Sequence, residues 1–105
     1  MKTIEIQILA RDVNNAGSFI DTNNCILATA IKRQLNVTAV IEGVDHSCIN
    51  NVIHYHDEYF VDEYEEDRVL ARGVPDDTLI RTINLQLYKD GWIRKVIDKF
   101  RSYWY

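Results

Sequence analysis

The chain has 105 residues, of which 47% are hydrophobic and 27% are charged, a size and balance that predict one compact domain over residues 1–105. Its formal net charge of −4 argues against a general duplex-DNA binder, which needs basic surface to displace counterions from the phosphates. Because no apolar run is long enough for a membrane span or a secretion signal, we expect a cytoplasmic protein.

A strand followed by a polar loop is predicted at the start of the chain. Isoleucines alternate with polar residues between residues 3 and 10, which is typical of a strand with one buried face. Residues 12–24 are rich in asparagine and aspartate, a composition that predicts a long surface loop. Long loops in small domains often carry the binding surface.

The clearest prediction is a helix at residues 22–35, TNNCILATAIKRQL, where the small polar residues at the start can cap the first turn. Its apolar residues recur at helical spacing and form one face, comprising Leu27, Ala28, Ile31 and Leu35. We expect Ile31 to pack near the centre of the core, against Ile6 and Ile8 of the first strand. Arg33 is expected to point toward solvent.

A meander of short strands is predicted next. Its three apolar runs are separated by turn residues and lie at 37–41, 46–49 and 52–56. Cys48 is expected in the core. His54 and His56 are two residues apart, so we expect them to share the exposed face of one strand.

The rest of the chain begins with the segment 57–67, DEYFVDEYEED, which holds seven of the sixteen acidic residues, interleaved with aromatic ones. A helix is predicted from about Val61 to the break at Gly73. Residues 75–88 open with a proline and two aspartates, as helices often do, and we predict a helix there. The alternation of Ile83, Leu85 and Leu87 also fits a strand. The apolar spacing of residues 92–105 predicts a last amphipathic helix, with an extended end at 102–105 left open.

These elements predict an α+β fold, in which a small, mostly antiparallel sheet of about four strands is packed by two or three helices. The central helix carries the pattern C-x-L-A-x-A-I-K-R, formed by Cys25, Leu27, Ala28, Ala30, Ile31, Lys32 and Arg33. With the strand and loop before it and the meander and proline-led segment after it, this order resembles a family of small, mostly phage-encoded proteins of no known activity. The resemblance implies an α+β fold and a phage-like origin, and it transfers no functional residue.

Catalytic and metal-binding chemistry is not predicted. The chain has no pattern typical of a serine nucleophile, a phosphate loop or a zinc protease, so we expect no enzyme activity. Cys25 at a helix N-terminus could be a reactive thiolate, but a structural role is favoured because no base or second thiol lies nearby in sequence. His46, Cys48, His54 and His56 do not form a convincing zinc set, so neither a metal nor another cofactor is expected.

Two functions from different classes stay open. The first is a non-enzymatic binding protein that sequesters a nucleotide-like signalling molecule, in a phage setting to evade host immunity. A helix N-terminus and cations would meet the phosphate, aromatic rings would stack on the base, and a homo-oligomer would enclose the ligand. The expected ligand-binding residues are Arg11, Asn23, Asn24, Cys25, Arg33, Tyr88 and Trp92.

The second function is that of an acidic inhibitor or nucleic-acid mimic that binds a basic host protein. A dense negative field speeds association with a basic surface, and aromatic side chains within it would serve as anchors. The expected partner-binding residues are Asp57, Tyr59, Asp62, Glu63, Tyr64 and Glu66.

Overall fold

The computed structural model describes residues 2–87, and within them it shows the predicted α+β fold, with three helices and five strands in two small antiparallel sheets. In chain order the elements are β1 (Lys2–Leu9), α1 (Ala10–Asn15), α2 (Ile26–Leu35), β2 (Ala39–Ile41), β3 (His46–Ile49), β4 (Val52–Tyr55), α3 (Val61–Leu70) and β5 (Leu79–Leu87). The predicted helix at 92–105 lies outside the described residues. None of the helices described has the length and apolar content that a membrane crossing requires.

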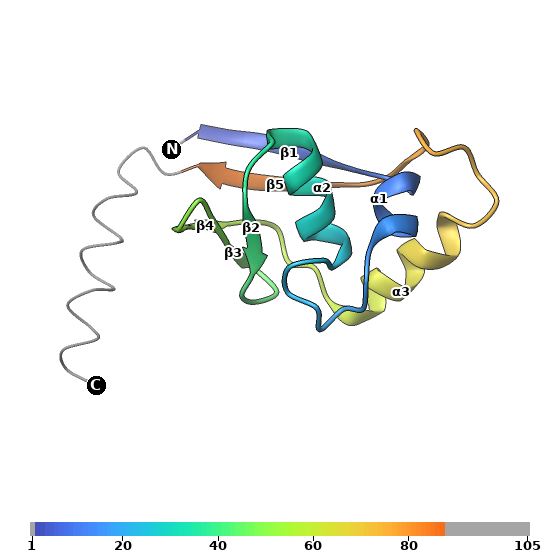
Figure 1. Ribbon diagram of the computed structural model, residues 1–105, viewed down its shortest axis with the longest axis horizontal. Helices are drawn as coiled ribbons and strands as arrows, with labels where there is room; N and C mark the ends of the chain where they lie inside the picture. The colour runs from blue at the N-terminus through green and yellow to red at the C-terminus, as the bar shows by residue number, and fades with distance from the viewer. Residues whose placement is uncertain (1, 88–105) are drawn as a thin grey trace.

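The helix α2 lies at the centre of the fold. It packs on β1, α1 and β2, and Figure 1 shows it beneath the β1–β5 ribbon, with the small sheet on one side and α1 and α3 on the other. Ile31 of α2 is fully buried in the same core cluster as Ile6 and Ile8 of β1, as predicted. The alternating isoleucines of β1 thus place their apolar face on the apolar face of α2.

The helix α2 begins at a residue other than the predicted caps, which were Thr22, Asn23 and Asn24. Cys25 is the N-cap residue, in extended backbone conformation, and its side chain forms no capping hydrogen bond. At the other end, Asn36 adopts a left-handed conformation with φ 54° and donates its backbone N–H to the carbonyl oxygen of Lys32. Asparagine tolerates this conformation better than most residues, which explains why the helix ends here.

The predicted helix at 75–88 is wrong, because residues 79–87 form the strand β5. This strand pairs antiparallel with β1 along its whole length, so that Ile83 lies opposite Ile6 and Leu85 opposite Ile4. Ile83 and Leu85 are buried at a two-residue spacing, which is the strand period. Pro75 begins a turn instead of a helix, and its carbonyl oxygen accepts the backbone N–H of Thr78 at 3.0 Å.

The polar loop is shorter than expected, because its first residues continue from β1 into α1. Asp12 and Val13 in this helix are both 1% exposed. The three-stranded meander is confirmed as β2, β3 and β4, but it forms a sheet of its own and does not join β1. Asn50 and Asn51 connect β3 to β4 with φ of 50° and 68°, as the favoured two-residue hairpin turn requires.

Side chains cover part of each outer edge of the β1–β5 ribbon. On the β1 edge, the Gln34 carboxamide accepts the backbone N–H of Gln7 at 2.8 Å and donates to the carbonyl oxygen of Glu5 at 2.7 Å. On the β5 edge, the Asp57 carboxylate accepts the backbone N–H of Asn84 at 2.8 Å. Gln34 therefore makes the pair of hydrogen bonds that one residue of an added strand would make.

Candidate functional site

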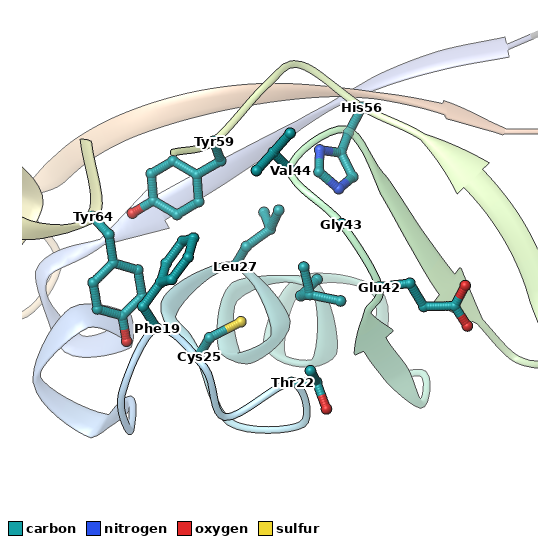
Figure 2. Close-up of a pocket in the computed structure, with 11 residues that line it drawn as sticks. Phe19, Thr22, Cys25, Leu27, Glu42, Gly43, Val44, His56, Tyr59 and Tyr64 are labelled. Carbon is teal, nitrogen blue, oxygen red and sulfur yellow. The ribbon is translucent and has the colours of Figure 1, made fainter. Parts of the chain in front are cut away.

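A cavity of about 180 Å³ lies between the start of α2, the end of β2 and the segment that leads into α3. Three separate parts of the chain, residues 19–27, 41–44 and 56–64, supply its walls, and Figure 2 shows their side chains gathered around one hollow. The lining residues are Phe19, Thr22, Cys25, Leu27, Ile41, Glu42, Gly43, Val44, His56, Tyr59 and Tyr64. Most of them are apolar or aromatic, which is the usual lining of a small-molecule site.

Three aromatic rings form one wall of the cavity. Phe19 meets Tyr64 edge to face, with centroids 5.4 Å apart and an interplanar angle of 80°, and Tyr59 lies 6.1 Å from Tyr64. The Tyr59 hydroxyl donates to Asp67 Oδ2 at 2.6 Å, and the Tyr64 hydroxyl donates to the carbonyl oxygen of Gly17. Because both hydroxyls are used within the protein, this wall offers ring surface rather than polar groups.

Charged side chains behind the wall hold the two tyrosines. Asp67 is fully buried and accepts both the Tyr59 hydroxyl and the Arg81 Nε–H, and Arg81 also pairs with Glu63 at 3.3 Å. Burial and the hydrogen bond to Asp67 raise the pKa of Tyr59, which therefore stays a neutral donor. Arg68 lies over the Tyr64 ring, 5.0 Å from its centroid. The rings are thus fixed before any ligand arrives.

His56 supplies a buried polar group to the opposite wall. Its side chain points from the end of β4 into the cavity (Figure 2), and the residue is only 7% exposed. Nδ1 lies 2.7 Å from the carbonyl oxygen of Asp57, and since a carbonyl only accepts, Nδ1 carries the proton. Burial lowers the pKa of His56, which outweighs the opposite effect of the backbone oxygens of Asp57 and His46. In this neutral ring, Nε2 is an acceptor, and it has no hydrogen-bond partner.

Cys25 contributes a thiol to the floor of the cavity (Figure 2). The residue is 4% exposed, and burial raises the pKa of the thiol more than the backbone N–H groups of Ala28 and Leu27 lower it. The thiol is therefore protonated near neutral pH, and it is a poor nucleophile. This agrees with the structural role that the sequence favoured.

The polar rim of the cavity is not basic. Thr22 and Glu42 stand at this rim, and both are exposed. No lysine or arginine occurs among the lining residues in the described part of the chain. With a carboxylate at the rim and a neutral imidazole inside, the site lacks a partner for a phosphate group.

The predicted ligand-binding residues are mostly elsewhere. Of these, Cys25 alone lines the cavity, Tyr88 and Trp92 lie outside the described residues, and the four that line other surfaces are Arg11, Asn23, Asn24 and Arg33. Lys32 Nζ donates to the backbone oxygen of Asn23 and to the side-chain oxygen of Asn24, so this part of the loop is tied to α2. Arg11 is exposed on α1.

Arg33 does not point freely into solvent, contrary to our expectation. Its guanidinium donates from Nε to Asp12 Oδ1 at 2.7 Å and from Nη2 to Asp12 Oδ2 at 3.0 Å. The same Nη2 donates to the carbonyl oxygen of Gln7 at 2.7 Å. Because Asp12 is 1% exposed, this arginine neutralises a buried carboxylate and joins α2 to α1 and β1. Arg33 is a structural residue.

Several residues predicted to bind a protein partner are also structural. Tyr59 and Tyr64 are 4% and 3% exposed, so they cannot serve as surface anchors. Glu63 pairs with Arg81 at 3.3 Å, and Asp57 closes the edge of β5 as described above. Asp62 and Glu66 are exposed, as expected. The acidic segment therefore presents fewer binding groups than its sequence indicates.

The histidines are also placed differently from the prediction. His54 and His56 are each 7% exposed rather than on an exposed face, because β5 covers this side of β4, where His54 Nδ1 lies 3.1 Å from the carbonyl oxygen of Gln86. Cys48 is half-buried and not part of the core cluster. Over residues 2–87, no group of three or more histidine, cysteine or acidic side chains is arranged to hold a metal ion.

No family model, curated protein or solved structure is significantly similar to this chain. The resemblance to phage-encoded proteins therefore stays a prediction, and the site has to be interpreted from its own geometry. Sequence reasoning missed His56 as a cavity residue. The surplus of aromatic residues was the one signal in the sequence for such a cavity. It could not show which rings share the cavity, because contacts between distant parts of the chain decide this.

Proposed function

We propose that the protein is a non-enzymatic binding protein whose cavity takes up one flat, mostly apolar ring of a small ligand. The observation that carries the proposal is the cavity itself, with a wall of three aromatic rings from Phe19, Tyr59 and Tyr64. Aromatic walls favour edge-to-face or offset contact with another flat ring. An apolar cavity of about 150 Å³ holds benzene, so a volume of about 180 Å³ suits a single ring or a small fused ring such as a nucleobase.

The size and charge of the site bear on the nucleotide-like ligand that the sequence led us to expect. The base of such a ligand would enter the cavity, while its sugar and phosphates would lie outside, beside Glu42. A phosphate is disfavoured there, so we place nucleobases and nucleosides ahead of nucleotides. A homo-oligomer would be needed to cover the parts left outside. Sequestration of a host signal by a phage-type protein is supported by the resemblance alone.

Binding without catalysis is the better proposal, because the groups of the site that could react are either hydrogen-bonded within the protein or made less reactive by burial. The two tyrosine hydroxyls are hydrogen-bonded inside the protein, and burial raises the pKa of the Cys25 thiol. Acid–base catalysis needs a titrating group with its pKa near the working pH and a partner in reach. His56 does not meet these requirements, because its pKa is lowered and its Nε2 has no hydrogen-bond partner.

The proposal is tested by thermal shift and calorimetry with adenine, adenosine and AMP. A ligand that binds the native state raises the unfolding midpoint, and we expect the shift for the base and the nucleoside to exceed that for the nucleotide. Val44→Phe should abolish the shift by filling the cavity, whereas Val40→Phe, the same change at a residue of similar exposure outside the cavity, should not. No shift with any ring compound would overturn the proposal.

A second candidate, binding of a basic protein partner, is favoured by one surface observation. The outer side of α3 exposes three apolar residues, Val61, Val69 and Leu70, at 46%, 60% and 47%. The exposed acids Asp62, Glu65 and Glu66 share this helix, so a basic partner with apolar side chains would match it in charge and in hydrophobicity.

The second candidate is tested by capturing host proteins on the immobilised chain at low salt. Asp62→Ser with Glu65→Ser should abolish capture of any specific partner, while Asp76→Ser with Asp77→Ser, an equal loss of charge at exposed positions outside α3, should preserve it. Equal capture by both double variants would reject this surface.

A further inference from the structure

The cavity contains a polar atom whose hydrogen-bonding capacity is unused. His56 is 7% exposed, lines the cavity and has no hydrogen-bond partner at Nε2. Among the residues that the structure describes, the other buried side-chain polar atom without a partner is Ser47 Oγ, and Ser47 does not line the cavity. Buried polar atoms are normally paired, so an unpaired one on a side chain that lines a cavity is a place where a ligand atom or a water can complete the hydrogen bond.

The chemistry of this atom is fixed by its neighbour. The Asp57 carbonyl oxygen, 2.7 Å away, requires the proton on Nδ1, which leaves a lone pair on Nε2. Near the ring, the groups with charge or titratable protons are the Asp45 carboxylate and the His46 imidazole, which are bonded to each other at 2.8 Å. The interior of the cavity therefore offers a ligand this acceptor, while Thr22 and Glu42 add polar groups only at the exposed rim.

We propose that His56 Nε2 accepts a hydrogen bond from the ligand, so that the protein selects heteroaromatic rings with a ring N–H or an exocyclic amine over rings of the same shape without a donor. This inference rests on the proposed function, because it presumes that a ring enters the cavity. A site built to hydrogen-bond a ligand rejects the analogue that lacks the matching group, since the buried atom of the site is then left unpaired. Amino-bearing nucleobases belong to the selected class.

The test compares two fused rings of nearly equal shape on the unaltered protein. Indole carries a ring N–H donor, and benzofuran has an oxygen at the same position and no donor. We expect calorimetry to show about tenfold tighter binding of indole, the size of effect that one buried hydrogen bond gives. Equal affinities would overturn this inference and leave the proposed ring binding intact, whereas failure of both probes to bind would overturn both.

Two substitutions attribute the preference to His56. In His56→Asn the side-chain amide can still donate to the Asp57 carbonyl oxygen, in place of Nδ1, but no atom replaces Nε2. Indole affinity should fall to that of benzofuran, and benzofuran affinity should not change; a merely structural role would weaken both equally. His56→Gln, whose amide reaches the position of Nε2, should restore part of the preference. Preference for indole that persists in His56→Asn would overturn the assignment.

Discussion

Arg81, whose side chain is 24% exposed, forms an ion pair with the fully buried Asp67 behind the aromatic wall of the cavity. Arg81 Nε lies 3.0 Å from both carboxylate oxygens of Asp67, and Asp67 is 0% exposed. The Tyr59 hydroxyl donates to the same carboxylate at 2.6 Å. This carboxylate therefore joins β5 to α3 and fixes the orientation of a ring that lines the cavity, so the stability of the fold and the shape of the site depend on one group.

Arg81→Met should reduce the free energy of unfolding by about 3–5 kcal/mol, because it leaves the Asp67 carboxylate buried without its counter-charge. Urea unfolding measures this loss. Arg72→Met, the same change at an exposed arginine, should stay within about 0.5 kcal/mol of the parent. Equal midpoints for the two variants would show that the ion pair contributes nothing to stability.

Ile31→Ala should reduce the free energy of unfolding by about 2–5 kcal/mol. Ile31 is 0% exposed at the centre of the core, so its truncation leaves an empty space among the packed side chains. The matched control is Ile20→Ala, since Ile20 is 85% exposed and its loss removes little buried surface. The stability of both variants is measured from the urea midpoint, provided that the dependence of the unfolding free energy on urea concentration is unchanged. A stable Ile31→Ala variant would contradict the packing of α2 on β1.

Arg33→Ala should be more damaging than a change at an ordinary surface cation. It removes the charged partner of Asp12, which is 1% exposed and would keep only the backbone N–H of Leu9, so we expect the free energy of unfolding to fall by about 1–3 kcal/mol. Arg11→Ala, at an exposed arginine on α1, should cost only tenths of a kcal/mol. Arg33→Ala should leave ring binding nearly unchanged in the folded protein, because Arg33 does not line the cavity.

The stability of the protein should fall as the pH decreases below neutral, in part because of His56. Burial lowers the pKa of His56 from its ordinary value of 6.5, so below that pH the unfolded chain binds a proton that the folded chain does not. This contribution is present above about pH 6.5 and is lost as the pH falls toward the folded pKa, with a slope of at most about 1.4 kcal/mol per pH unit. Urea unfolding between about pH 7.5 and pH 5 should show that the free energy of unfolding falls more steeply with decreasing pH for the parent than for His56→Asn. Equal slopes for the two proteins would contradict this role of His56.

The sequence predicted the elements whose patterns are local. The isoleucines of β1, the apolar face of α2, the asparagine turn before β4 and the start of α3 at Val61 each agree with the structure. The strand β5 was missed because residues 79–87 fit both a helical and a strand period, and the choice is made by pairing with β1, more than seventy residues earlier in the chain.

The site was less predictable than the fold because it is formed by residues that are far apart in the sequence. Arg33 lies at an outward position by helical spacing, yet α1 brings Asp12 beside it. Tyr59 and Tyr64 sit in a strongly acidic run, which indicates surface, yet both rings are buried against Phe19 and Asp67. No local sequence pattern shows these partners, so a prediction from residue type and spacing placed these side chains at the surface.

Gln34→Leu should make the protein associate. The change removes both hydrogen bonds that Gln34 makes to the edge of β1 and leaves unpaired backbone groups open to another chain. Light scattering coupled to size-exclusion chromatography should show mass rising with concentration. Gln86→Leu, the same change at an exposed position on β5, should behave as the parent. If neither variant associates, the edge is protected by something other than Gln34.

The groups that cover the edge of β1, Gln34 and Arg33, both belong to the last turn of α2. Fraying of that turn and exposure of the strand edge are therefore a single local event, which needs far less free energy than global unfolding. The amide hydrogen of Gln7 reports it directly, because its acceptor is the Gln34 side chain and its exchange rate measures how often the turn opens. Slow self-association during storage should then follow the exchange rate of this one amide rather than the melting temperature.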